Sequence, residues 1–189
     1  MSLVNIPGLK IKTPSVQTLG VLVFGRLSSC FCVVSTADCL PDGQGEIAVV
    51  DRIQDGDTVK LKDGRHVRVL GINTPEVTHG DKPGQALGQE SRQEAEGFFR
   101  ADKQIRIFYD IQRFDRYGRT LAHVYDAKGN SLAAHLLRKG LGFHVAIPPN
   151  VSLNQCLHKQ ETIARDKSLG VWSNRDWRPI TASKLKLNE

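Results

Sequence analysis

The sequence predicts an α+β protein built on a five-stranded OB-type β-barrel with three α-helices. Five short segments alternate apolar and polar residues, as strands do, and turns rich in glycine and aspartate separate them. Three longer segments repeat apolar residues every three or four positions, as amphipathic helices do. The first helix stands between the third and fourth strands, which is the order of an OB-type barrel, a shape used for oligonucleotide binding.

The first three strands are predicted close together in the chain. Residues 47–53 form the first strand, which ends at Asp55-Gly56. Residues 58–61 and 66–70 also alternate, and they flank Asp63-Gly64. Because Asp-Gly suits a two-residue type I′ turn, these two segments are expected to form a β-hairpin.

The remaining elements follow as one helix, two strands and two helices. Their predicted ranges are 85–100, 103–111, 119–125, 131–140 and 152–167. Ser152 is the expected N-cap of the last helix, since serine accepts a hydrogen bond from the first free backbone amides of a helix. Residues 77–84 contain two glycines and a proline and predict a loop.

The first 37 residues differ in composition from the rest. They hold three basic residues and no acidic one, and an apolar run from Leu19 ends at Ser35-Thr36-Ala37. This pattern predicts a secretory signal peptide, and hence an exported protein that is periplasmic or secreted. An N-terminal membrane anchor and lipidation at Cys30 are the alternatives, although Arg26 within the run argues against a stable span.

The predicted organisation is therefore a signal peptide or anchor at 1–37, a lead-in at 38–45, a barrel domain at 46–174 and a tail at 175–189. Loss of the signal removes three of 26 Lys and Arg and none of 20 acidic residues, so the net charge falls from +6 to +3. Bulk charge then gives little support for a polyanionic partner. We expect a monomer with no stable membrane span in the mature form.

Two cysteines, Cys39 and Cys156, remain after removal of the signal. An even number in an exported chain favours one disulfide. The alternative is that both are unpaired, small hydrophobic residues.

Residues suited to metal and phosphate chemistry gather around the predicted hairpin. Asp55, Asp57 and Glu76 lie at its two ends, and Arg68 lies on the returning strand. Carboxylates are hard oxygen ligands that suit a cation such as calcium, and a guanidinium suits a phosphate. Each residue alone is as readily a polar turn or a surface charge, but the combination favours a site. A second phosphate candidate is Arg119.

Several separate segments, in the same order, resemble the staphylococcal nuclease (thermonuclease) family. They are DGDT at 55–58, RVLGINTPE at 68–76, DRYGRTL at 115–121, LAAHLLRKGLG at 132–142 and LGVWS at 169–173. The resemblance implies a calcium-dependent endonuclease that hydrolyses DNA and RNA and leaves 3′-phosphorylated ends.

The resemblance also implies residue roles. It implies calcium ligation by Asp57 and by the backbone carbonyl of Thr74, and a water-orienting or general-base role for Glu76. It implies phosphate binding by Arg68 and Arg119. Tyr117 matches a phosphate-contacting tyrosine, and Arg116 lies beside it as a further substrate contact.

Two departures from the family pattern stand out. Asn73 occupies a position where the best-known member has an aspartate ligand, so an amide oxygen would bind calcium there with one negative charge fewer. The best-known member also has two tyrosines that pack against the nucleotide, and residues 143–149 of this sequence contain none. Phe143 or His144 is then the candidate for base stacking. Two other functions stay open: a catalytically inactive nucleic-acid-binding module, and an envelope protein whose barrel binds another phosphorylated ligand.

Overall fold

The computed structural model describes residues 39–78, 80 and 83–173. The expected signal peptide at 1–37 and the expected tail at 175–189 lie outside the described residues, so neither is tested. Within the described part of the chain, no helix is both long enough and apolar enough to cross a membrane.

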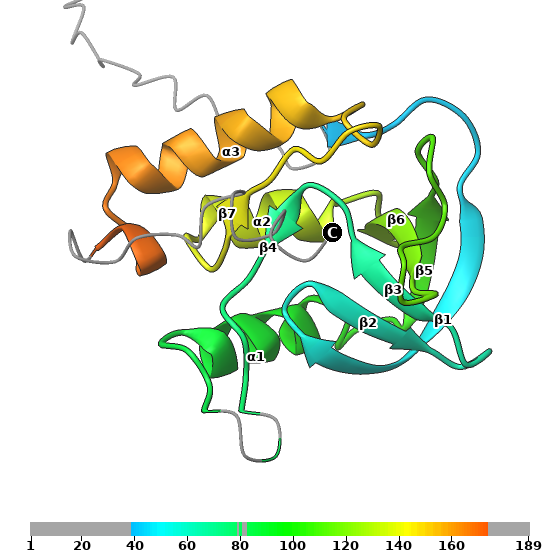
Figure 1. Ribbon diagram of the computed structural model, residues 1–189, viewed down its shortest axis with the longest axis horizontal. Coiled ribbons are helices and arrows are strands. Elements are labelled where there is room, and N and C mark those ends of the chain that lie inside the picture. Colours follow the sequence, from blue (N-terminus) through cyan, green and yellow to red (C-terminus); the bar gives the residue numbers. More distant parts are fainter. Residues whose placement is uncertain (1–38, 79, 81–82, 174–189) are drawn as a thin grey trace, which may run out of the picture. The chain divides into compact units, whose positions relative to one another are not determined.

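Five strands close into a barrel, which confirms the predicted fold class (Figure 1). In the order in which they pair, they are β1 (Glu46–Asp55), β2 (Thr58–Leu61), β3 (His66–Val69), β6 (Thr120–Asp126) and β5 (Gln104–Phe108), and β5 returns to β1. The β3–β6 pair is parallel and the other pairs are antiparallel. The parallel pair places two segments side by side that are about fifty residues apart in the chain.

Three α-helices occur among the described residues, close to the predicted ranges. They are α1 (Gly88–Phe98), α2 (Leu132–Arg138) and α3 (Asn154–Asp166), followed by a 3-10 turn at Gly170–Trp172. Helix α2 contacts both α1 and α3, and its Leu132, Leu136 and Leu137 are fully buried in the core. Ser131 caps α2, because its hydroxyl accepts a hydrogen bond from the amide of Ala134.

The structure contains a second, small sheet that the sequence pattern did not predict. Strand β4 (Ile72–Asn73) pairs with β7 (Phe143–His144) in antiparallel register, with Ile72 opposite His144. Two residues per strand are too few to show an alternating pattern. This sheet fixes the segment that carries Asn73 and Thr74 against the chain that follows α2.

Two local predictions were wrong. The β2–β3 connection is not a two-residue type I′ turn, because Leu61 pairs with Arg65 across three loop residues and only Gly64 has a positive φ, of 93°. That geometry is a type I turn followed by a left-handed glycine. Ser152 does not cap α3, which begins two residues later with Leu153 at the cap position. The Ser152 amide donates instead to Asp110.

Cys39 and Cys156 form a disulfide, the pairing favoured by the cysteine count, with their Cα atoms 5.6 Å apart. Cys39 is fully buried, and its carbonyl accepts a hydrogen bond from the hydroxyl of buried Tyr125. The residue that precedes the barrel is thereby attached to both α3 and β6.

Reduction of this disulfide should destabilise the fold. It closes a loop of 117 residues, and loss of a crosslink of that span costs roughly 4–5 kcal/mol in the chain-entropy treatment. Denaturant unfolding of the oxidised protein, the reduced protein and a Cys39→Ala/Cys156→Ala variant would measure the change. An unaltered midpoint after reduction would contradict it.

The stability of the barrel should also fall in mild acid because of His123. This side chain is 4% exposed, its Nε2 has no hydrogen-bond partner among the described residues, and Asp110 lies 3.9 Å away. Burial lowers the pKa of His123 from 6.5 to about 4, against the smaller opposing effect of Asp110. Between these values the unfolded chain binds a proton that the folded chain does not, so stability is complete above pH 6.5 and falls as the pH drops.

A His123→Leu variant should therefore lose less stability between about pH 6.5 and 4 than the parent, by roughly 3 kcal/mol at 1.36 kcal/mol per pKa unit. Unfolding free energies at several pH values give the comparison. Parallel curves for the parent and His123→Leu would refute the assignment.

Candidate active site

Asp57 is the buried acid at the centre of the candidate site. It is 4% exposed and follows Gly56 in the turn between β1 and β2. Its Oδ2 accepts the backbone amide of Thr74 at 2.8 Å, and its Oδ1 accepts the Thr58 hydroxyl at 3.0 Å. The carboxylate therefore links the start of β2 to the residue that follows β4.

Gly56 is required by this close approach, although sequence reasoning did not select it. A side-chain carbon at that position would meet the hydroxyl of Ser91 from α1 and lie 2.9 Å from Cγ2 of Thr74. The signal in the sequence is the glycine between two aspartates, which is also the usual composition of a polar turn.

Arg68 extends from β3 towards the same acid. Its Nη1 lies 3.1 Å from Oδ2 of Asp57 and donates to the carbonyls of Val69 and Ile72, each at 2.9 Å. Its Nη2 donates to Oδ1 of Asn73 at 2.8 Å. The guanidinium thus brings the side-chain oxygens of Asp57 and Asn73 together around one positive charge.

Arg119 lies one residue before β6 and is oriented by Asp115. Its Nε donates to Oδ2 of Asp115 at 2.7 Å, and its backbone amide donates to Oδ1. Within the described residues, no hydrogen bond uses its two terminal nitrogens. Burial raises the pKa of Asp115, but the hydrogen bonds from Arg119 outweigh that effect and hold the pKa below its usual range. The Asp115 carboxylate thus fixes Arg119 in place.

A groove of about 400 Å³ brings the two arginines together. Arg68 lines it from β3 and Arg119 from the residue before β6, and Tyr117 and Arg116 line it from the loop between β5 and β6. The Arg116 guanidinium donates to the Tyr117 hydroxyl at 2.8 Å and lies 4.9 Å from the ring centre. Apolar side chains also line the groove, among them Leu121, Val145, Ile147 and Pro148.

The groove thus contains every residue expected to touch a phosphate, at a size that suits one nucleotide.

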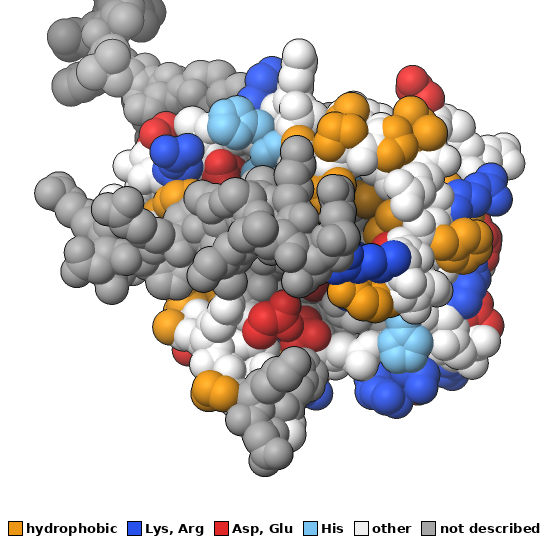
Figure 2. All heavy atoms as spheres, in the orientation of Figure 1, with side chains coloured by type: hydrophobic (Ala, Val, Ile, Leu, Met, Phe, Trp, Pro, Cys, Tyr) orange, Lys and Arg blue, Asp and Glu red, His pale blue; other side chains and the backbone are white. Residues whose placement is uncertain are grey.

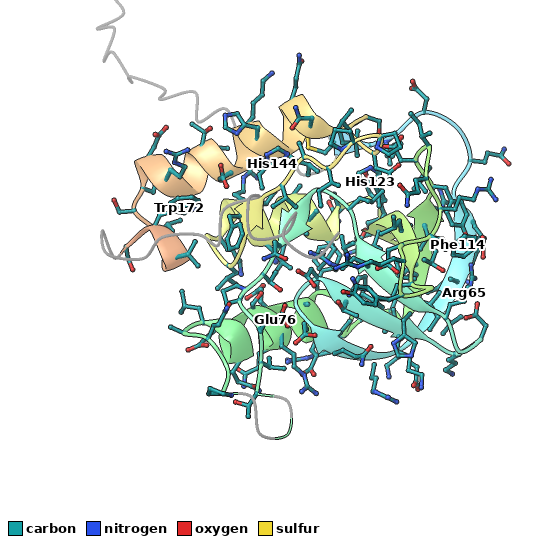
Figure 3. All side chains as sticks on the ribbon, viewed as in Figure 1. Arg65, Glu76, Phe114, His123, His144 and Trp172 are labelled. Carbon is teal, nitrogen blue, oxygen red and sulfur yellow. A yellow bond between two sulfur atoms is a disulfide. The ribbon has the colours of Figure 1, made fainter. Side chains whose placement is uncertain are left out.

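Glu76 lies on the segment between β4 and α1, and Figure 3 shows it beside α1. Its backbone amide donates to the side chain of Gln85 at 3.1 Å, and its carbonyl accepts the Gln85 amide at 2.8 Å. These two bonds hold the base of the 77–84 loop closed. Asp55 accepts the next amide, that of Val77, at 3.4 Å. Glu76 is not among the residues that line the groove.

The residues around Asp57 are of the types that a hard cation prefers. Asp57 offers a carboxylate, Asn73 an amide oxygen and Thr74 a backbone carbonyl, and the buried Thr74 hydroxyl has no hydrogen-bond partner among the described residues. No group of three or more His, Cys, Asp or Glu side chains that could hold a metal occurs in those residues. The donor set therefore fits calcium in ligand type, with water needed for most of its six to eight positions.

The structure changes the expectation for base stacking. Phe143 is 5% exposed and belongs to β7, so its ring has almost no accessible face. His144 is half-buried, its Nε2 has no hydrogen-bond partner within the described chain, and its ring lies 5.7 Å from that of His158. The exposed aromatic ring in the groove is Tyr117, at 67% exposure, so it presents the accessible stacking surface there.

Comparison with known proteins gives consistent matches. The family profile described as "Staphylococcal nuclease homologue" matches residues 66–174. The chain is 31% identical to "Thermonuclease" of Staphylococcus intermedius over 134 residues, which is 69% of this chain and 79% of that protein. It is 32% identical to "Thermonuclease" of Staphylococcus hyicus over 128 residues, 66% of this chain and 75% of that protein.

A more distant match comes from another genus. "Endonuclease YncB" of Bacillus subtilis (strain 168) is 31% identical over 128 residues, which is 66% of this chain and 60% of that protein. The profile match includes Arg68, Asn73, Glu76 and Arg119 but starts after Asp57.

Proposed function

Because this chain belongs to the staphylococcal nuclease family, we propose that it is a nuclease that hydrolyses phosphodiester bonds within DNA and RNA strands. The observation that carries the proposal is the groove lined by Arg68 and Arg119, with the buried carboxylate of Asp57 in contact with Arg68. Two fixed cations beside a buried acid suit a phosphate diester better than a neutral ligand.

In this proposal the arginines stabilise negative charge on the phosphate. Arg119 keeps two terminal nitrogens for phosphate oxygens, since Asp115 occupies only its Nε. Arg68 is held rigidly by backbone carbonyls and contributes a fixed positive charge. Donors that are already oriented cost no reorganisation when charge develops during the reaction.

Glu76 would serve as the base that orients and deprotonates water. The water oxygen forms a bond to phosphorus, its proton passes to the Glu76 carboxylate, and the bond from phosphorus to the 5′-oxygen breaks in line. The departing oxygen takes a proton from solvent, and the other product keeps a 3′-phosphate. Tyr117 and Arg116 would contact the substrate at the edge of the groove.

Calcium, held by Asp57, Asn73 and the Thr74 carbonyl, would neutralise charge on the phosphate oxygens when bound. Arg68 has a second role in this arrangement. It contacts Asp57 and Asn73 directly, so it keeps both ligand side chains in place but also competes for their negative charge.

We also propose that the protein is exported. The Cys39–Cys156 disulfide supports this, because such bonds persist in oxidising compartments.

Replacement of the proposed base or phosphate ligand should strongly slow cleavage without loss of the fold. Glu76→Gln and Arg119→Ala should each lower kcat by about 10²–10⁴, the usual contribution of a general base or of a charge-stabilising donor. Cleavage of single-stranded DNA with calcium, and then with chelator, measures the loss.

Exposed residues of the same type provide the controls for that experiment. Glu90→Gln in α1 and Arg113→Ala in the β5–β6 loop should retain parental rates. Full activity of Glu76→Gln and Arg119→Ala would reject the assignment. Binding of DNA by the parent without any cleavage would identify an inactive binding module instead.

Restoring a carboxylate at position 73 should reduce the calcium requirement. Asn73→Asp adds a negative ligand, and calcium affinity depends on the number of ligand charges. We expect the calcium concentration for half-maximal cleavage to fall on the order of tenfold, or about 1.4 kcal/mol. Because Arg68 contacts the side chain of residue 73, it will reduce this gain in calcium affinity. A requirement equal to that of the parent would show that residue 73 does not bind the ion.

A further inference from the structure

Three basic side chains form a row across the outer face of the barrel, beside the groove. Arg52 of β1 pairs directly with Lys60 of β2, and Lys60 pairs with His66 of β3. Residues directly opposite each other in antiparallel strands place their side chains on the same face. We call Arg52, Lys60 and His66 the basic row.

The basic row faces away from the barrel interior. The residues adjacent in sequence, Ile53, Val59 and Val67, are buried in the core. A register irregularity between Val50 and Arg52 lets β1 place Arg52 outside even though Val50 points inward.

The row continues into the groove. Val67 pairs with Thr120 across the parallel β3–β6 ladder, so His66 and Arg119 are the next residues in that register. His66 is also two residues before Arg68 on β3, which places both side chains on the same face of that strand. A strand of negative charge bound at Arg68 and Arg119 would therefore meet the row on leaving the groove.

The positive charge of the row is only weakly neutralised. Arg52 pairs with neighbouring Asp51 at 3.3 Å, but both side chains are exposed, and such pairs contribute little. No described carboxylate pairs with Lys60, and His66 Nδ1 donates to the Gln54 side chain at 2.6 Å. Figure 2 shows Lys and Arg side chains with a histidine gathered over the β2–β3 part of this face.

The nearby Arg65 gives the contrast. It donates to Glu46 at 2.5 Å and to Asp63 at 2.7 Å, and these acids hold it in a structural network together with Tyr109. Two carboxylates, one from β1 and one from the hairpin turn, therefore neutralise Arg65, while no described carboxylate pairs with Lys60 on the outer face.

We propose that the basic row binds the phosphates of the polynucleotide strand beyond the bond that is cleaved. This rests on the proposed nuclease function and adds a second binding region to it. The distance from Arg52, along the basic row, to Arg119 in the groove is three strand spacings, on the order of 14 Å. A strand bound at Arg119 and continuing along this line would therefore bring phosphates beyond the one in the groove to the basic row. A dinucleotide bound in the groove is too short to cover it.

The experiment measures binding of a labelled single-stranded oligonucleotide, in chelator, over a range of salt concentrations. Each lost contact to a single strand should reduce the slope of log K against log salt by about 0.7, so Arg52→Gln/Lys60→Gln should reduce it by about 1.4. With calcium present, the double variant should lose kcat/KM at least several-fold more on the oligonucleotide than on a dinucleotide. The single variant Lys60→Arg keeps the positive charge and should therefore show the parental salt slope.

Lys128→Gln is the matched control, because it removes one exposed lysine at the opposite end of β6. It should leave the salt slope unchanged, and thermal unfolding should show that every variant folds as the parent does. If the parent protein cleaves and the double variant keeps the parental salt slope, the proposed role of the basic row is rejected and the proposed nuclease function stands. A parent that neither binds nor cleaves would overturn the proposed function and, with it, the row.

Discussion

The buried carboxylate of Asp57 is the interaction on which the candidate site depends. A charged group removed from water must be compensated, and here three donors compensate it: a backbone amide, a hydroxyl and a guanidinium. These donors come from Thr74, Thr58 and Arg68, which belong to different parts of the fold. Placing the acid therefore also fixes the β2 terminus, the residue after β4 and the arginine of β3 relative to one another.

The second constraint is the parallel pairing of β3 with β6. It joins the arginine of the first hairpin to the arginine that precedes β6, which no local contact in the chain could do. The loop before β6 then positions Arg119, because Asp115, four residues earlier, accepts hydrogen bonds from both the amide and the Nε of Arg119. The strand pairing brings the two cations together, and Asp115 of the loop orients Arg119.

The sequence was sufficient for the elements that repeat a pattern over several residues. The five barrel strands and three helices have such patterns, and the Asp-Gly pair located the hairpin turn. The sequence was not sufficient where only a few residues determine the local structure. Asp63-Gly64 fits both a two-residue and a three-residue turn, and β4 and β7 have two residues each. The backbone amide of Ser152 donates a hydrogen bond to Asp110, and Ser152 does not cap the helix. Motifs named the site residues, but only coordinates show that Arg68 already contacts Asp57 and Asn73.

The parallel β3–β6 pair also determines what a partly unfolded chain would lose. Separation of these two strands moves Arg68 away from Arg119 and so takes apart the groove that both line, while α2 and α3 could keep their helical backbone bonds. Opening free energies differ between regions of one protein, and strand pairing over long sequence distances depends on the complete barrel. Phosphodiester cleavage by this chain is therefore a sensitive reporter of barrel closure, whereas its helical circular dichroism signal is not.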